Sequence, residues 1–432
     1  MNGNILLFII NIPIIQEVVR KYLIYSEMVF LAADIFVILV FIILSLNGRI
    51  RLKIVPITYW FLAAMFLAWT IVIQILKGRH LGIYGVGLRA TFMPLVYMLV
   101  SAQYISTVKN APDRIFMCVN IWILVAGVMA FLQISLGKYH PINAVWGQLA
   151  VGVGDYSTGE KGILIEGLFR PTSIFTHTGK FGQTLFTLVL FKWCYLVFCG
   201  KKKSFIYYAL ILFDLAAIFA SGQRGAVIFL VVAVVIMFVV YSRQKGANIS
   251  RFIGVVCIMV IGLSIFSIIK PGITEAIFDR FYSAVAAVPI RLQGNFVLPI
   301  KTMISEYLVM GEGFGFFTFG AQLFGGTLVY RYITMEGLGE SSLIRLCGEV
   351  GVVPSLMLIM AYMTIVFTAY RKYKFNQLTP IGAICIFYVI WIVCLMLWSN
   401  TADIFANSVV TTLGYALSGA VFSHVWKSCI KK

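Results

Sequence analysis

Residues 201–243 read KKKSFIYYALILFDLAAIFASGQRGAVIFLVVAVVIMFVVYSR. Two apolar segments, 204–220 and 225–241, are joined by a very short turn and flanked by basic residues. Each segment approaches the length of about twenty residues that a helix needs to cross a bilayer. The stretch therefore predicts a helical hairpin in a membrane, with the turn on one side and both basic flanks on the other.

The composition of the whole chain extends this prediction. Of the 432 residues, 61% are hydrophobic and only 12% are charged, and the mean hydropathy is +0.96. A soluble domain cannot cover so much apolar surface, so we expect an all-α polytopic membrane protein with one integral membrane domain over residues 1–432. The apolar segments predict about twelve transmembrane helices, at 5–19, 28–46, 54–76, 83–107, 115–136, 174–199, 204–220, 225–241, 252–269, 342–368, 381–398 and 404–426.

The first segment is short for a span, and it lacks the basic flank and small-residue cleavage site of a signal peptide. We expect it to be retained in the membrane.

The basic residues predict the orientation. The loops after segments two, four, six, eight and ten, together with the C-terminal tail, hold seventeen Lys and Arg and one acid, which accounts for +16 of the formal charge of +18. The positive-inside rule places these loops and both termini in the cytoplasm. Because topology explains the charge, it gives no reason to expect a nucleic-acid partner.

Cysteines and histidines give no sign of a cofactor. The eight cysteines lie in or beside apolar segments without CxxC spacing, and the four histidines are scattered. No acidic pair has the spacing of metal ligands, and no Ser/His/Asp pattern is present. We expect neither a metal nor another cofactor.

Two external loops are long enough to cover a site. The first spans residues 137–173 and the second, between spans nine and ten, spans residues 270–340. The second loop is rich in Phe and Tyr, which argues against disorder and predicts that part of it is helical.

A minority of cations lie on the side that charge statistics disfavour, at Arg170, Arg224, Arg280, Arg291, Arg331 and Arg345. Arg170, His177 and Lys180 crowd the entrance of the segment that begins near residue 174, where Pro171 and Gly179 mark a turn. A helix entrance offers free N–H groups and the positive end of the helix dipole, which together suit phosphate. The alternative is that these residues only anchor the helix end.

Arg224 lies in the turn Ser221-Gly-Gln-Arg-Gly225, where glycines let the backbone pass close to a bound group and the guanidinium presents a fork of donors. In the second loop, Arg280 and Arg291 would share a helical face, although Pro289 interrupts such a helix.

Segment ten opens with Glu340-Ser-Ser-Leu-Ile-Arg345, and Glu349 follows four residues after Arg345. Ionisable residues at this depth are candidates for a functional site, and the alternative is a structural Arg345–Glu349 pair. Arg89, Asp34 and Asp214 also lie inside spans and are candidates for internal pairing. The glycine-rich run 311–320 has no βαβ context for a nucleotide, and it predicts a lid or a close backbone approach.

Taken together, these residues resemble the O-antigen polymerase and O-antigen ligase superfamily of bacterial envelope proteins. The resemblance rests on Arg170-Pro…Phe175-Thr-His177…Phe181-Gly182, Ser221-Gly-Gln-Arg224-Gly-Ala, Gly311-Glu-Gly-Phe-Gly-Phe-Phe and Glu340-Ser-Ser-Leu…Glu349-Val-Gly351, in this order over roughly residues 85–370. It implies a membrane glycosyltransferase of the GT-C type in the bacterial inner membrane. The site would face the periplasm and use glycans on undecaprenyl pyrophosphate without metal or nucleotide sugar.

The resemblance also implies roles for the site residues. Arg170, Arg224 and Arg291, with Arg280, Arg345 and Lys180 in support, would bind pyrophosphate and glycan, and Glu340 or His177 would be the catalytic base. Ligases commonly have a His-Asn pair where this chain has Glu340-Ser341, a departure that favours a polymerase of O-antigen or capsule over a ligase that builds lipopolysaccharide. Expected partners are the lipid bilayer, the lipid-linked glycans, a chain-length regulator and a flippase. A flippase or polysaccharide transporter is the alternative from another class.

Overall fold

The computed structural model describes residues 3–24, 28–50, 52–137, 140–143, 164–165, 168–199, 205–244, 297–318, 321–326, 341–399, 405 and 408–424, together with residues 282, 286, 289 and 293. Within this part of the chain, nine helices are long and apolar enough to cross a membrane. They are α1 (Gly3–Tyr22), α2 (Met28–Leu46), α3 (Ile57–Leu76), α4 (Leu81–Thr107), α5 (Ala111–Leu136), α7 (Thr178–Phe198), α9 (Arg224–Ser242), α16 (Val352–Phe375) and α17 (Pro380–Trp398). The protein is a helical, multi-pass membrane protein, as its composition predicts.

The remaining elements are shorter. The helices are α8 (Phe205–Ala220), α13 (Leu298–Glu306), α15 (Ser342–Val350) and α18 (Ser408–Leu417), with 3-10 turns η1 (Leu52–Ile54), η2 (Pro141–Asn143), η5 (Ala321–Phe324) and η7 (Gly419–Phe422). Strands β1 (Leu164–Ile165) and β2 (Leu168–Phe169) form a two-residue antiparallel pair. The pair lies inside the first predicted external loop, and α13 and η5 lie inside the second.

Two predicted spans differ from the helices observed. Segment 342–368 is not one helix, because it breaks at Gly351, where φ is +99° and a Cβ would come within 2.4 Å of the Val309 carbonyl oxygen. The last predicted span, 404–426, contains α18 of only 10 residues followed by η7. The predicted span 252–269 lies outside the described residues.

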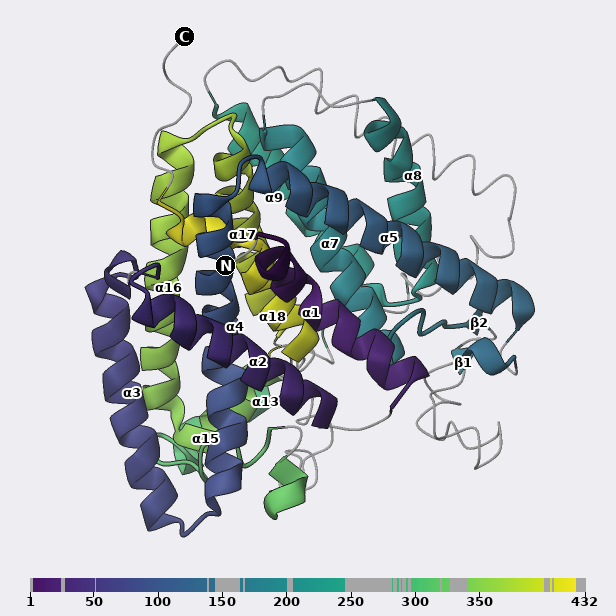
Figure 1. Cartoon of the computed structure of the whole chain (residues 1–432). Coiled ribbons are helices and arrows are strands. Elements are labelled where there is room, and N and C mark those ends of the chain that lie inside the picture. The colour runs from purple at the N-terminus through teal and green to yellow at the C-terminus, as the bar shows by residue number, and fades with distance from the viewer. Residues whose placement is uncertain are drawn as a thin grey trace.

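The helices surround a buried centre made by α7 and α17. Of the most apolar window in each helix, 94% is buried in α7 and 78% in α17, against 28% in both α2 and α9. A helix that is apolar on all sides and also buried belongs to the middle of a bundle. Figure 1 shows α3 beside α16 at one edge, α5 tilted across the opposite side, and α1, α4 and α18 between them. The mostly exposed apolar faces of α2 and α9 are therefore suited to contact lipid.

Two charged pairs lie inside the described helices. Arg89 on α4 donates to Asp34 on α2, and Lys192 on α7 lies 2.7 Å from the carboxylate of Asp214 on α8. Asp214 also accepts a hydrogen bond of 3.0 Å from the indole of Trp193. An unpaired charge in the apolar interior is costly, which explains why each of these charges has a partner of opposite sign. Because the partners lie on different helices, each pair connects two neighbouring helices.

Candidate functional site

The candidate site begins where α7 begins. His177 has extended backbone angles and is the N-cap of α7, and its Nδ1 accepts a hydrogen bond of 3.0 Å from the backbone N–H of Gly179. The cap satisfies one of the N–H groups that a helix leaves free at its first turn. The helix thus starts at the turn that Pro171 and Gly179 predicted, and its positive dipole end lies beside Arg170 and Lys180.

The surroundings of His177 affect the protonation of its imidazole. Desolvation by the surrounding protein, and then the positive charges of Lys180 and Arg170, lower the pKa of His177 below its usual value. These surroundings therefore favour the neutral ring, although the carboxylate of Glu17 acts in the opposite direction. Because Nδ1 accepts a hydrogen bond, the proton lies on Nε2. In this tautomer Nε2 carries the hydrogen and can donate it to an anion, so His177 is better suited to hold an anion than to remove a proton.

The same local bond occurs at two other histidines. Nδ1 of His80 accepts from the N–H of Gly82 at 3.0 Å, and Nδ1 of His140 accepts from the N–H of Ile142 at 3.2 Å. Capping is thus the common structural role of these rings, and the catalytic role of His177 stays a prediction.

A buried glutamate that the sequence did not single out holds the start of α7 in place. Glu17 on α1 is 0% exposed and lies 2.9 Å from Lys180 Nζ. Its second carboxylate oxygen accepts hydrogen bonds from the backbone N–H and the hydroxyl of Thr176, at 3.2 and 2.8 Å. Arg20 lies 3.5 Å from the same carboxylate, and its guanidinium lies 4.2 Å from the centre of the Phe30 ring. Glu17 therefore ties α1 and α2 to the helix entrance that contains His177 and Lys180.

The segment before α7 is held from two further sides. Lys21 Nζ donates to the hydroxyl of Thr172 at 2.7 Å and to the carbonyl of Ser173. The side chain of Gln133 on α5 accepts from the backbone N–H of Ser173 at 2.7 Å and donates to the Ser173 carbonyl at 3.0 Å. These bonds fix Ser173 at a φ of +53° and define the path of the chain between Arg170 and the helix.

The turn between α8 and α9 meets this segment. Gly222 has a φ of +61°, and a Cβ there would come within 2.9 Å of Arg170 Cγ. A Cβ on Gly182 of α7 would come within 2.2 Å of the side-chain oxygen of Gln223. The structure therefore packs Arg170, the first turns of α7 and the turn 221–225 together, and Arg224 is the first residue of α9. Of the candidate residues, Arg170, His177, Lys180 and Arg224 lie at one end of the helices.

Arg345 lies on another element. It is 7% exposed on α15, where Nη1 lies 3.2 Å from the Glu349 carboxylate and donates to the hydroxyl of Thr318 at 2.6 Å. Glu349 also accepts from the backbone N–H of Phe317 at 3.0 Å. The structure thus contains the Arg345–Glu349 ion pair, which was one of the two alternatives that the spacing of four residues predicted.

The glycine-rich run makes the close backbone approach that was one of its two interpretations. The N–H groups of Glu312 and Gly313 donate to the carbonyls of Gly348 and Glu349, at 2.8 and 3.0 Å. A Cβ on Gly311 would come within 2.3 Å of the Glu349 backbone. Phe314, Phe316 and Phe317 are buried, and the Phe314 ring packs against Phe66 of α3 and Tyr84 of α4. Residues 311–318 are therefore packed between α15 and the facing ends of α3 and α4.

The end of α17 contacts both the start of α15 and the turn 221–225 before α9. Trp398 packs against Phe186 of α7 and Phe229 of α9, with ring centroids 5.6 and 5.2 Å apart. A Cβ on Gly225 would come within 2.5 Å of the Trp398 ring. The next residue, Ser399, accepts a hydrogen bond of 2.9 Å from the backbone N–H of Ser342 at the start of α15. The starts of α9 and α15 therefore border the same end of α17.

Three predicted site residues, Glu340, Arg280 and Arg291, lie outside the described residues, as does Arg331. Among the residues that are described, no group of three or more His, Cys, Asp or Glu side chains could hold a metal ion. No protein-family model matches the chain, and no curated protein is significantly similar to it.

Proposed function

We propose that this protein is a GT-C-type membrane glycosyltransferase that polymerises glycan repeat units carried on undecaprenyl pyrophosphate. The observation that supports this most is the packing of Arg170, His177, Lys180 and the turn of Arg224 around the first turn of α7. Three cationic side chains, a capped helix entrance and an imidazole N–H together offer donors suited to a phosphate-bearing ligand.

The positive-inside distribution supports the orientation that this function needs. With about twelve spans and cytoplasmic termini, the start of α7 faces the periplasm or the outer face of the inner membrane. Lipid-linked glycans delivered by a flippase would meet the arginines there.

In the proposed reaction, a hydroxyl of the acceptor sugar attacks the anomeric carbon of the donor. The new glycosidic C–O bond forms as the C–O bond to pyrophosphate breaks, and undecaprenyl pyrophosphate leaves. Arg170, Arg224 and Lys180 stabilise its growing negative charge, and Arg280 and Arg291 of the second external loop are candidates to add to it. His177 donates from Nε2, which leaves Glu340 as the candidate to take the proton of the hydroxyl.

The base assignment makes a specific prediction. Glu340→Gln reduces polymerisation by roughly 100-fold or more, as expected for loss of a general base. His177→Asn, which preserves an N-cap acceptor, reduces it less, because it removes only one donor to the leaving group. Polymer length and amount in cells that contain equal levels of each variant measure both effects. Full synthesis by both Glu340→Gln and His177→Ala would show that neither residue is the base.

A transporter is the second candidate, and one observation favours it. The chain breaks between α15 and α16 at Gly351, and α18 is only 10 residues long. Discontinuous helices of this kind are common around the binding sites of secondary transporters. A ligase is the alternative within the enzyme class.

The surface glycans of a strain that lacks the protein distinguish these functions. A polymerase defect leaves single repeat units on the carrier outside the cell, and wild-type protein restores a ladder. A ligase defect leaves full-length polymer on undecaprenyl pyrophosphate. If repeat units never reach the outer face, the protein is a transporter.

Substitution of one glycine tests whether Arg170 must lie where it does. Gly222→Ala forces a side chain into the left-handed region, which costs roughly 1–2 kcal/mol, and it also pushes Arg170 aside. Gly48→Ala is the matched control, because φ there is +62° and nothing lies within 4 Å of the added Cβ. We expect similar losses of thermal stability in both variants but a drop in polymer, of about tenfold, only in Gly222→Ala. Equal polymer in the two variants would contradict a role for Arg170.

A further inference from the structure

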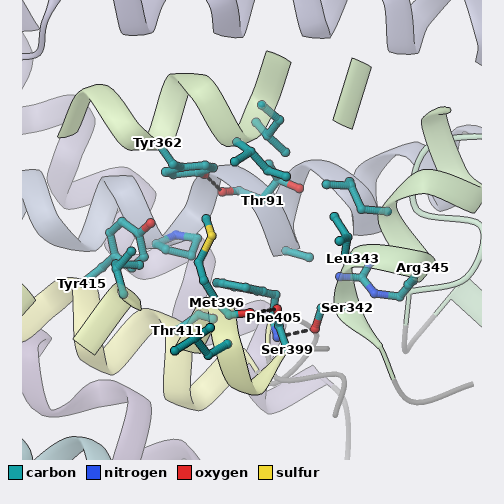
Figure 2. A pocket seen from close by; sticks show the side chains of 17 residues that line it. Thr91, Ser342, Leu343, Arg345, Tyr362, Met396, Ser399, Phe405, Thr411 and Tyr415 are labelled. Carbon is teal, nitrogen blue, oxygen red and sulfur yellow. Dashed lines mark hydrogen bonds between the residues drawn. The ribbon is translucent and has the colours of Figure 1, made fainter. Parts of the chain in front are cut away.

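A cavity of about 370 Å³ lies among α4, α15, α16, α17 and α18. Cavities of a few hundred Å³ with apolar walls and a few polar groups are typical of ligand sites. Figure 2 shows the side chains around it, with Arg345 and Tyr415 toward opposite ends. Its lining includes Ser342 and Arg345 of α15, Leu358 and Ile359 of α16, and Ile392 of α17.

The polarity of the walls changes along the cavity. Ser342, Arg345 and Ser399 lie toward one end, where the hydroxyl of Ser342 accepts a hydrogen bond of 3.0 Å from the backbone N–H of Phe405. Away from that end the walls are formed mainly by Leu, Ile, Met and Tyr side chains, and the hydroxyl of Tyr362 donates to the carbonyl of Thr91. The ligand that fits has one polar end and a hydrocarbon body.

The cavity extends into the membrane-spanning part of the helices. Ile392 precedes Ser399 by seven residues, which is about 10 Å along the axis of α17. Ala90 and Pro94 lie nine to thirteen residues into α4, about 14–20 Å from its start. Pro94 has no N–H to donate to the carbonyl of Ala90, so the regular bonding of α4 is interrupted beside the cavity. A hydrocarbon chain in this space would run parallel to the lipid chains outside.

The polar end of the cavity borders the candidate site. Ser399 bonds the start of α15, and the residue before it, Trp398, packs on Gly225 beside Arg224. A molecule with its anionic group at Arg224 would therefore have its hydrocarbon chain at the mouth of this cavity. Charge and polarity both match an amphiphile whose head is a phosphate and whose tail is apolar.

We propose that this cavity binds the polyprenyl chain of the lipid-linked substrate, in the units nearest the pyrophosphate. The proposal rests on the proposed function for the choice of a polyprenyl chain. It makes the inner surface of α16, around Leu358 and Ile359, a site for recognition of the carrier lipid.

The test uses purified full-length protein in lipid nanodiscs and a tritiated undecaprenyl phosphate that carries a diazirine in its second isoprene unit. Leu358→Trp fills the cavity from α16, because Leu358 is only 4% exposed and lines it. Leu356→Trp is the matched control, because Leu356 is 51% exposed on the same helix and does not line the cavity. Ile359→Trp is a second filling variant in case Leu358→Trp fails to fold.

We expect photolabelling of wild-type protein at the cavity-lining residues of α4, α15, α16, α17 or α18. We also expect at least a tenfold weaker affinity in the filling variants, and unchanged affinity in Leu356→Trp. Labelling confined to other helices, or equal affinity in all folded variants, would overturn the proposal. So would equal competition by phosphatidylglycerol, because the cavity would then be a general lipid site. Since the probe has no glycan, binding is measured independently of transfer, and a failed transferase assay does not affect the result.

Discussion

We expect Arg224→Ala to abolish the polymer ladder of the proposed reaction and to leave single repeat units on their carrier. The side chain begins α9 at the turn that packs on Arg170 and on the first turns of α7. Loss of one donor to the charge that develops in a transition state typically reduces a rate by about 100- to 1,000-fold. Arg224→Lys keeps the charge but loses the planar fork, so we expect it to restore only part of the polymer.

The control for Arg224 lies at the other end of the same helix. Arg243 is the C-cap residue of α9 and is exposed in a loop predicted to be cytoplasmic. Arg243→Ala should retain the full ladder. Polymer length is measured by gel electrophoresis of surface glycans after protein levels in the membrane are matched. A normal ladder from Arg224→Ala would remove this residue from the site.

We expect the second large effect from Glu17→Gln, which should lower the free energy of unfolding. The carboxylate of Glu17 is fully buried and interacts with Lys180, Arg20 and Thr176. Removing one partner of a buried ion pair typically costs about 3–5 kcal/mol, and we expect the lower part of this range because Lys180 is 25% exposed. The start of α7 loses its support, so we expect the proposed polymerisation to fall as well.

A double-mutant cycle separates this interaction from general damage. Lys180→Met should destabilise wild-type protein more than it destabilises Glu17→Gln, because in that background the ion pair is already absent. Glu306→Gln on α13 alters an exposed carboxylate and is expected to be neutral. Thermal unfolding in detergent is measured for the purified wild type, the two single variants, the double variant and Glu306→Gln. Additive losses from Glu17→Gln and Lys180→Met would show that the two residues are not coupled.

Local sequence patterns predicted the elements that depend on local physics. Apolar length identified eight of the nine long helices in the described part of the chain, whereas α16 was predicted to begin ten residues too early. The turn predicted after Pro171 does precede α7. The Arg345–Glu349 pair follows from a spacing of four residues, which places two side chains on one helical face. The break at Gly351 also has a local signal, because Gly followed by Pro354 is typical of one helix that ends and another that begins.

The sequence could not reveal contacts between distant segments. Glu17 stands in an apolar segment 163 residues before Lys180, and no spacing rule connects them. An acid inside an apolar segment, one turn before Arg20 and Lys21, indicates a network of internal charges. Its partner Lys180 on α7 could not be predicted, because that contact depends on how α1 packs. The approach of Gly222 to Arg170 and the apolar cavity beside α17 likewise depend on tertiary packing.

The most direct test of the proposed function is transfer by purified protein in nanodiscs that contain only undecaprenyl-pyrophosphate-linked repeat units. We predict oligomers of increasing length, with release of undecaprenyl pyrophosphate in a one-to-one ratio to the bonds formed, and loss of both products in Arg224→Ala. If wild-type protein forms no oligomer but moves the same lipid across the membrane of sealed vesicles, the protein is a transporter and the account of a glycosyltransferase is wrong.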